Sequence, residues 1–239
     1  MSNLFNTGHV AKLDEIQSAR LRRGMSGIGL EIEELIRRLE SGGVAGKSAD
    51  IRETQAKRLW DLGYGRELNI PTFETYLATI PEVPASLLAD DPELPLLTLD
   101  DPRLPLTVRA RLAGVRHAEL GYNDGDLVPF DERHKTPAGP YWFRAHNGRS
   151  IRNKKPSDCR KACTGKLLSG TADVLIALFT HHKDVAKEDE HIMDGPGSVR
   201  REDRACCSYL EVWDGGPRLY GDLVDDAYPR CGSVVFRRD

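Results

Sequence analysis

The most informative stretch is Gly139–Lys166, GPYWFRAHNGRSIRNKKPSDCRKACTGK, in which three adjacent aromatic residues precede an Asn-Gly pair and a run of cations. Both central residues of a type I′ turn need positive φ, which asparagine and glycine tolerate. The pattern therefore predicts a two-residue hairpin at Asn147 and Gly148, between a strand from Tyr141 to His146 and a strand from Arg149 to Arg152. In this register His146 lies opposite Arg149.

A helix is expected directly after the hairpin. Pro156 presets φ for a first helical turn, and either Ser157 or Asp158 can cap the unpaired amides. The residues from Cys159 to Cys163 then continue the helix. The N-terminal end of a helix offers unpaired N–H groups and the positive end of the helix dipole, so it attracts anions.

Cations are concentrated in this stretch. They are opposed only by Asp158, and they comprise Arg144, Arg149, Arg152, Lys154, Lys155, Arg160, Lys161 and Lys166. We therefore predict an anion-binding site formed by Arg152, Lys154, Lys155, Ser157 and Arg160. The alternative interpretation is a solvated strand edge, on which cations deter edge-to-edge aggregation.

The expected partner of this basic element is an anionic small molecule or an acidic protein surface. Nucleic acid is a weaker candidate. Tyr141 or Trp142 could stack on its bases, but the formal net charge of the chain is −3 and does not steer the whole protein toward a polyanion.

The chain of 239 residues is long enough for one large domain or two small ones. Its N-terminus lacks the cationic start and apolar core of a secretory signal. Its longest apolar run, Val174–Phe179, is far shorter than the ~20 residues that a membrane-spanning helix needs. We therefore expect a cytoplasmic protein without membrane contact, whose five cysteines are reduced thiols.

The region 1–80 is predicted to be helical. The apolar spacing of Ile28, Ile32, Leu35, Ile36 and Leu39 predicts a helix from Ser26 to Glu40, through which a homo-oligomer could form. A less regular helix is expected from Val10 to Arg23. Asp50 and Glu53 form a capping-box pattern for a helix that runs to Leu62. A short helix is expected between Pro71 and Pro81.

Residues 81–105 are rich in proline and acidic residues, which predicts a connector containing a short strand at Leu96–Leu99. Residues 106–239 are expected to form an α+β domain that carries the basic hairpin. A helix is predicted from Thr107 to Ala118, and Thr171 should cap a second helix, Ala172–His182, whose apolar residues surround it and predict burial.

Strands are predicted at Cys206–Trp213, at Arg218–Val224 and at Ser233–Arg237. The predicted fold is therefore α+β, with a helical N-terminal half and a small antiparallel β-sheet with a buried helix in the C-terminal half.

One cluster could carry chemistry: His181, His182, Asp184, Glu190, His191 and Asp194. These residue types can ligate a divalent metal, and histidine can act as a general base. The spacing matches no metalloenzyme pattern that fixes ligands on one helical turn, and a polar helix end explains it as well. We therefore predict no metal and no cofactor.

Several phrases in the second half resemble a family of uncharacterised bacterial proteins. These are NKKPSDCR (153–160), DGPGS (194–198), WDGGPRL (213–219) and PRCGS (229–233). LWDLGYGREL (59–68) and residues 102–114 are also similar. The resemblance covers most of the chain after the first fifty residues. It implies a recurring bacterial fold and brings no activity or catalytic residue.

The expected function is that of a cytoplasmic binding or adaptor protein whose basic hairpin and helix receive an anionic partner. Two alternatives remain open. One is a metal-assisted hydrolase that uses the His/Asp/Glu cluster, and the other is a structural protein that pairs through its N-terminal helices.

Overall fold

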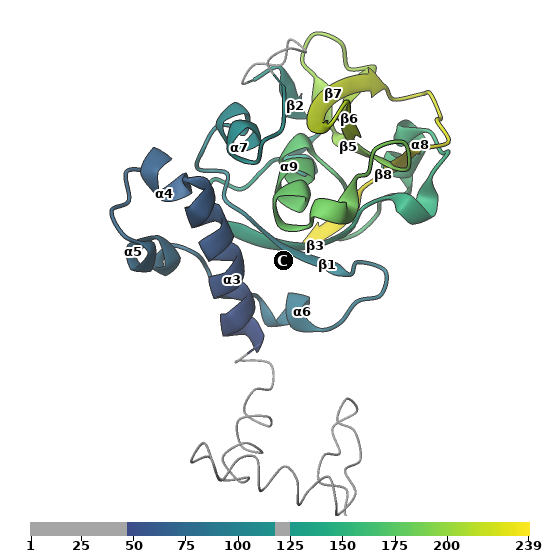
Figure 1. Ribbon diagram of the computed structural model, residues 1–239. Coiled ribbons are helices and arrows are strands. Elements are labelled where there is room, and N and C mark those ends of the chain that lie inside the picture. Colours follow the sequence, from purple (N-terminus) through teal and green to yellow (C-terminus); the bar gives the residue numbers. More distant parts are fainter. Residues whose placement is uncertain (1–46, 118–124) are drawn as a thin grey trace, which may run out of the picture. The chain divides into compact units, whose positions relative to one another are not determined.

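The computed structural model describes residues 47–117 and 125–239, and residues Ala49–Asp239 form one compact unit. Figure 1 labels most of its helices and strands. The helices predicted at Val10–Arg23 and Ser26–Glu40, and the oligomer contact through them, lie outside the described residues.

In the part of the chain that the structure describes, four helices precede β1 (Leu96–Asp100): α3 (Lys47–Leu62), α4 (Tyr64–Glu67), α5 (Phe73–Ala78) and α6 (Ala85–Leu88). α3 ends at Leu62 as predicted, because Gly63 adopts a φ of 105° that favours glycine. It begins before Asp50, which lies in the first turn, so the predicted capping box does not start this helix. The Thr72 side chain caps α5 by accepting a hydrogen bond from the Thr75 amide.

The first sheet, sheet A, has four strands in the order β1-β3-β9-β4. They are β1 (Leu96–Asp100), β3 (Tyr141–His146), β9 (Val235–Arg238) and β4 (Leu168–Ser169), and all neighbours are antiparallel. α3, α5 and α6 cover one face of sheet A, where they enclose Trp142, Leu97 and Leu99 in a buried apolar cluster. β1 confirms the strand predicted at Leu96–Leu99.

The second sheet, sheet B, has five strands. They are β2 (Leu127–Pro129), β5 (Ile192–Arg200), β6 (Cys206–Trp213) and β7 (Gly216–Leu223) in that order, and β8 (Cys231–Ser233) pairs with β5. β6 and β7 confirm two predicted strands. β5 was not predicted, and its pairing with β8 is parallel whereas its other pairings are antiparallel.

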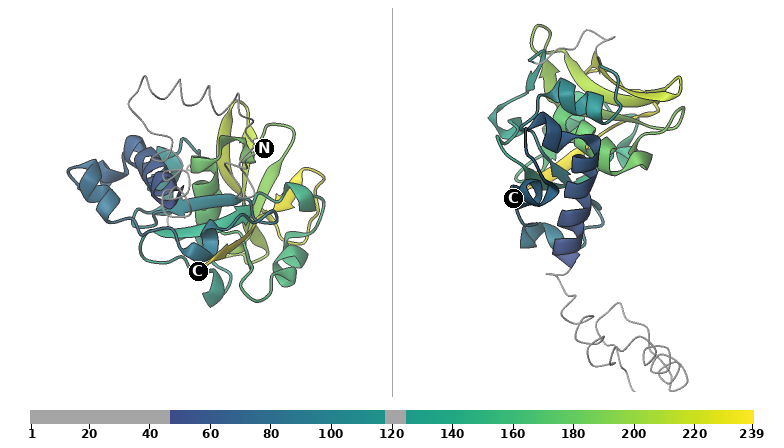
Figure 2. Two further views of the ribbon diagram at one scale, coloured as in Figure 1. Left: turned by 90° about the horizontal axis from the view of Figure 1, so that it is seen from below. Right: turned by 60° about the vertical axis from the view of Figure 1, so that its left-hand side comes forward.

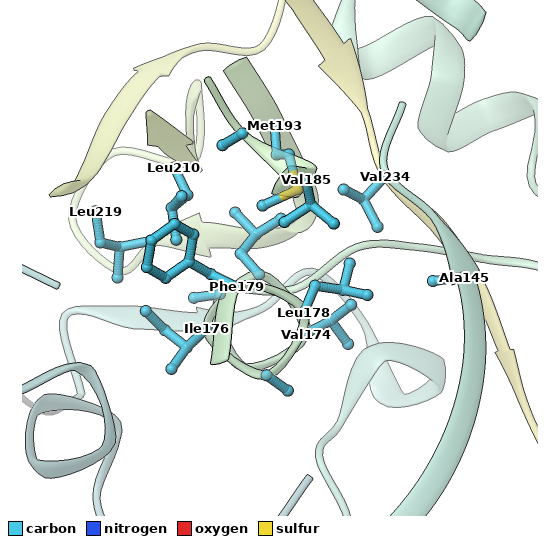
Figure 3. Close-up of a cluster of buried hydrophobic side chains, with 14 of the residues drawn as sticks. Ala145, Val174, Ile176, Leu178, Phe179, Val185, Met193, Leu210, Leu219 and Val234 are labelled. Atoms are coloured by element: carbon cyan, nitrogen blue, oxygen red, sulfur yellow. The ribbon is translucent and has the colours of Figure 1, made fainter. Parts of the chain in front are cut away.

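Helix α9 (Ala172–His181) lies between the two sheets and contacts β1 on one side and β5 and β6 on the other (Figures 1 and 2). Its residues are buried almost all round, as the sequence predicted, and Thr171 caps it by accepting the amide of Val174. Figure 3 shows Val174 and Leu178 of α9 in the same apolar cluster as Met193 and Leu210 of sheet B.

The remaining elements of the described residues lie in the connections. α7 (Leu106–Leu112) and the one-turn helices η3 (Glu132–His134) and η5 (Lys183–Val185) lie on segments that pass between the two sheets. The one-turn helix η4 (Arg149–Ile151) and α8 (Pro156–Ala162) lie between β3 and β4 of sheet A. α7 is shorter than the predicted helix, because Gly114 follows it with a φ of 75°.

The predicted hairpin is wrong in its second half. β3 is a strand, but the residues after the Asn-Gly pair form η4, so His146 does not pair with Arg149. The partner of His146 is Val235 of β9, while β1 occupies the opposite edge of β3, so no edge remains for a hairpin strand. The Asn147 side chain instead accepts the amide of Arg149 and turns the chain into η4.

The described residues therefore form a mixed fold of helices and antiparallel sheets, which confirms the predicted α+β class in outline. The single small sheet that we predicted is in fact two sheets around a central helix. No helix in residues 47–117 and 125–239 combines the length and the apolar character needed to cross a membrane.

Candidate functional site

The five residues of the predicted anion site do not act as one open cluster. Lys154 and Lys155 are exposed. Arg152 donates to the carbonyl of Glu190 (3.1 Å), and Arg160 donates to the carbonyl of Pro196 (2.9 Å). The Arg160 guanidinium also lies 3.6 Å from the centroid of the Phe130 ring. The two arginines thus hold neighbouring segments together, and the two lysines project into solvent.

The helix start that was expected to receive the anion is occupied by the protein itself. The Ser157 amide donates to the Val224 carbonyl (2.8 Å), and its hydroxyl donates to Asp225 (2.6 Å). That hydrogen bond, aided by the nearby cations, lowers the pKa of Asp225. α8 begins at Pro156 as predicted, but it has seven residues and no side-chain cap. The anion-binding role of these residues stays a prediction.

The histidine-rich cluster is dispersed by the fold. His182 hydrogen-bonds Thr98 of β1 (3.1 Å), whereas His191 hydrogen-bonds the carbonyl of Asn147 (2.7 Å). Asp194 belongs to β5. Among the side chains that the structure describes, no group of three or more His, Cys, Asp or Glu residues is arranged to hold a metal ion.

A chain of three polar residues that the sequence did not reveal joins η3 to sheet A. His134 Nδ1 lies 2.7 Å from the Asp131 carboxylate, and His134 Nε2 lies 2.9 Å from the Ser169 hydroxyl. Burial lowers the pKa of His134, although Asp131 opposes this shift, so the imidazole is neutral at pH 7. The order carboxylate, imidazole, hydroxyl is that of a nucleophilic triad.

This triad-like chain is closed to substrate. Ser169 has no exposed surface, and a side chain on Gly197 would lie 2.4 Å from the Ser169 carbonyl oxygen and 2.5 Å from the His134 ring. The amides of Gly170 and Gly197 are bonded to backbone carbonyls and do not form an oxyanion hole. We therefore interpret the chain as a clamp between the η3 loop and β4. The Asp131-x-x-His134 spacing was the one visible signal, because Ser169 is distant in sequence.

A buried charge network ties sheet A to α9. Arg109 of α7 is 2% exposed, and it forms ion pairs with Asp100 of β1 (2.8 Å) and with Asp173 of α9. Burial opposes the charge of Arg109, but the two carboxylates raise its pKa. Burial raises the pKa of Asp100 to about 6, against the effect of Arg109. Thr136 also donates to Asp173 (2.8 Å), so the network is structural.

The open surface with binding character lies on the outer side of sheet B. In β6 and β7, Leu210 and Leu219 face the core, so the alternating residues face away from it. We call this surface the β6–β7 face and define it by Tyr209, Glu211, Trp213, Arg218, Tyr220 and Asp222. Trp213 is 44% exposed and Tyr220 is 39% exposed.

The side chains of the β6–β7 face are ordered against one another. Arg218 forms an ion pair with Glu211 (2.6 Å), and its guanidinium lies 5.3 Å from the Trp213 ring and 5.9 Å from the Tyr220 ring. The Tyr209 and Tyr220 rings meet edge to face at 5.5 Å. Of the five large apolar side chains that stand exposed in the described residues, Trp213 and Tyr220 belong to this face. Leu223 lies at the end of β7 on the opposite side of the strand, and Tyr228 lies in the segment after β7.

A preformed patch of tryptophan, tyrosine and arginine is the composition that dominates binding energy at protein interfaces. The sequence predicted β6 and β7 as strands. It did not show which of their faces is open, because this depends on the packing of α9 against Leu210 and Leu219.

Comparison with protein-family models, with curated proteins and with solved structures finds no match to this chain.

Proposed function

We propose that this chain is a binding protein that engages a macromolecular partner through the β6–β7 face. The observation that carries the proposal is the gathering of Trp213, Tyr220 and Arg218 on the side of sheet B opposite α9. Trp213 and Tyr220 keep 44% and 39% of their surface exposed. Large apolar side chains that gather on a surface mark interaction sites in soluble proteins. The cytoplasmic location predicted from the sequence remains part of the proposal.

The rigidity of the patch supports the same function. Tyr220 packs edge to face on Tyr209 across the β6–β7 ladder, Trp213 lies 5.3 Å from the Arg218 guanidinium, and Arg218 is held by Glu211. Side chains that are already ordered lose less conformational entropy when a partner binds. A hydrolase is supported less well, because the one triad-like chain of the described residues has a Ser169 without exposed surface.

The proposal is tested by selecting peptides from a random display library on the wild-type protein and then on Trp213→Ala and on Tyr220→Ala. Leu167→Ala is the matched control, because Leu167 is an apolar side chain of 38% exposure outside the β6–β7 face. We expect peptides that bind the wild type and Leu167→Ala and that bind both face variants about tenfold or more weakly, as for interface hot spots.

Native-like circular dichroism of each variant shows that a loss of binding is not a loss of folding. If every selected peptide binds Trp213→Ala and Tyr220→Ala as tightly as the wild type, the β6–β7 face is not the binding surface.

A further inference from the structure

The charge around the β6–β7 face restricts the chemistry of its partner. The segment Tyr209–Tyr228 carries five carboxylates, namely Glu211, Asp214, Asp222, Asp225 and Asp226, against one cation, Arg218. Arg218 is already paired with Glu211 (2.6 Å), and Asp225 lies beside Ser157 and the lysines of the basic element. Arg116 adds a second cation, because it forms a β-bridge with Arg218 at the edge of β7 and donates to the Trp213 carbonyl (2.9 Å). Carboxylates still outnumber these cations, and Asp222 lies at the end of the β6–β7 ladder away from Arg116.

A further carboxyl group lies on the same side of sheet B, in a buried position next to this face. Asp194 of β5 pairs across the ladder with Tyr209 and is 3% exposed, and among the described residues its Oδ2 atom has no hydrogen-bond partner. Burial, with a contribution from Asp222, raises the pKa of Asp194 to about 7. Burial also raises the pKa of Asp222, and the neighbouring Asp226 and Glu211 add to the shift. A cation brought to this surface would relieve the repulsion between these groups.

The rings of the face are suited to cations. Arg218 shows this within the molecule, because its guanidinium is within 6 Å of both the Trp213 and the Tyr220 centroids. Since both side chains remain well exposed, they offer further ring surface to a second guanidinium or ammonium group.

We infer that the partner of the β6–β7 face is a polypeptide segment rich in arginine or lysine. Its aliphatic stems pack on Trp213 and Tyr220, and its charges pair with Asp222 and Asp226. This inference rests on the proposed function and names the chemistry of the partner. Single-stranded nucleic acid, which also stacks on exposed rings, is disfavoured because its phosphates would meet the surplus of carboxylates.

The test is fluorescence anisotropy with three labelled probes of equal length: a peptide of alternating arginine and glycine, its counterpart of alternating glutamate and glycine, and an oligouridylate. We expect the arginine peptide to bind most tightly and to weaken as salt rises. The double variant Asp222→Asn/Asp226→Asn should bind it about tenfold more weakly, as for loss of close charge pairs at an interface.

The matched control is Glu82→Gln/Glu93→Gln, which removes the same charge from exposed residues outside sheet B. This control should bind the arginine peptide within about twofold of the wild type, because separated surface charges are screened. The inference is overturned if the glutamate peptide or the oligouridylate binds more tightly than the arginine peptide, or if the Asp222/Asp226 variant behaves like the control.

The peptide selection separates this inference from the proposed function. Selected peptides that depend on Trp213 and Tyr220 but carry no excess of arginine or lysine would overturn the cationic partner and leave the binding face intact. Selected peptides that are indifferent to both aromatic residues would contradict the proposed function itself.

Discussion

The two sheets of this protein differ in how far their faces are covered by other elements. Sheet A is covered on one face by α3, α5 and α6 and on the other by α9, and Gln55 of α3 hydrogen-bonds the backbone of its edge strand at Leu97 and Leu99. Sheet B packs one face on α9 and leaves the rings of the β6–β7 face exposed. The difference is that sheet A is packed on both faces, whereas sheet B is packed on α9 on one side and keeps Trp213 and Tyr220 exposed.

Two tryptophans give the largest expected contrast between the sheets. Trp142 of sheet A is 3% exposed and donates to the Pro81 carbonyl (2.9 Å), so Trp142→Ala should lower the free energy of unfolding by about 3–5 kcal/mol. Trp213→Ala should lower it by less than about 0.5–1 kcal/mol, because this side chain is 44% exposed. Urea unfolding of both variants measures the contrast. Equal losses would show that the β6–β7 face is a structural part of the core.

Two arginines should show the same contrast between the sheets, with a slightly smaller difference in the free energy of unfolding. Arg109→Ala would leave Asp100 and Asp173 without their cation in a buried site, and we expect a loss of about 3–4 kcal/mol. Arg218→Ala removes an ion pair to Glu211 from a side chain that is 28% exposed, for which about 1 kcal/mol is expected. The measurement is unfolding at neutral pH. A cost for Arg218→Ala as large as that for Arg109→Ala would mean that the charge pair on the β6–β7 face stabilises the fold.

The pH dependence of stability should have opposite signs for Asp194 of sheet B and for His134, which contacts sheet A. The pKa of Asp194 in sheet B is raised from 3.8 to about 7, so the folded state binds more protons than the unfolded state between these values, and stability falls as pH rises through them. Asp194→Asn should therefore stabilise the protein above pH 7. A pKa shift corresponds to about 1.4 kcal/mol per unit. Because the protein around a buried charge relaxes, we expect a smaller gain of about 1–2 kcal/mol.

The histidine clamp at sheet A should give the smallest and opposite effect. Its pKa is lowered from 6.5 by burial, so the unfolded state binds the proton more readily, and stability is lost as pH falls below about 6.5. His134→Asn should remove this acid-side slope. Thermal unfolding of both variants between about pH 5 and pH 8 measures the two slopes, and slopes of the same sign would contradict the assigned burial of these groups.

Local signals in the sequence predicted much of the fold. Continuous apolarity and a threonine cap identified α9, and alternation identified β6. The hairpin failed for a tertiary reason: β1 and β9 already flank β3, and a side chain on Gly148 would lie 2.2 Å from the Gly232 carbonyl oxygen, so its positive φ serves a close approach of two segments. β5 was missed because Gly195-Pro196-Gly197 is typical of a loop, and only its pairing with β2, β6 and β8 makes it a strand.

The candidate site was less predictable than the fold. The run of cations drew the prediction to Lys154 and Lys155, but the sequence cannot show that Asp225 lies beside the start of α8. The β6–β7 face was visible as alternating aromatic and charged residues, yet the same alternation fits a face packed on the core. Its exposure follows from which side α9 occupies, and this is fixed by contacts between segments far apart in the chain.

We expect Trp213 to contact the partner and Trp142 to remain buried in sheet A. Both can be followed in one experiment through their indole N–H resonances in a ¹⁵N-labelled protein, assigned with Trp213→Phe and Trp142→Phe. We expect titration with a peptide selected on the wild-type protein to shift the Trp213 resonance and to leave that of Trp142, which is hydrogen-bonded to Pro81, unchanged. A peptide that binds without shifting the Trp213 resonance would contradict the proposed role of Trp213 in partner binding.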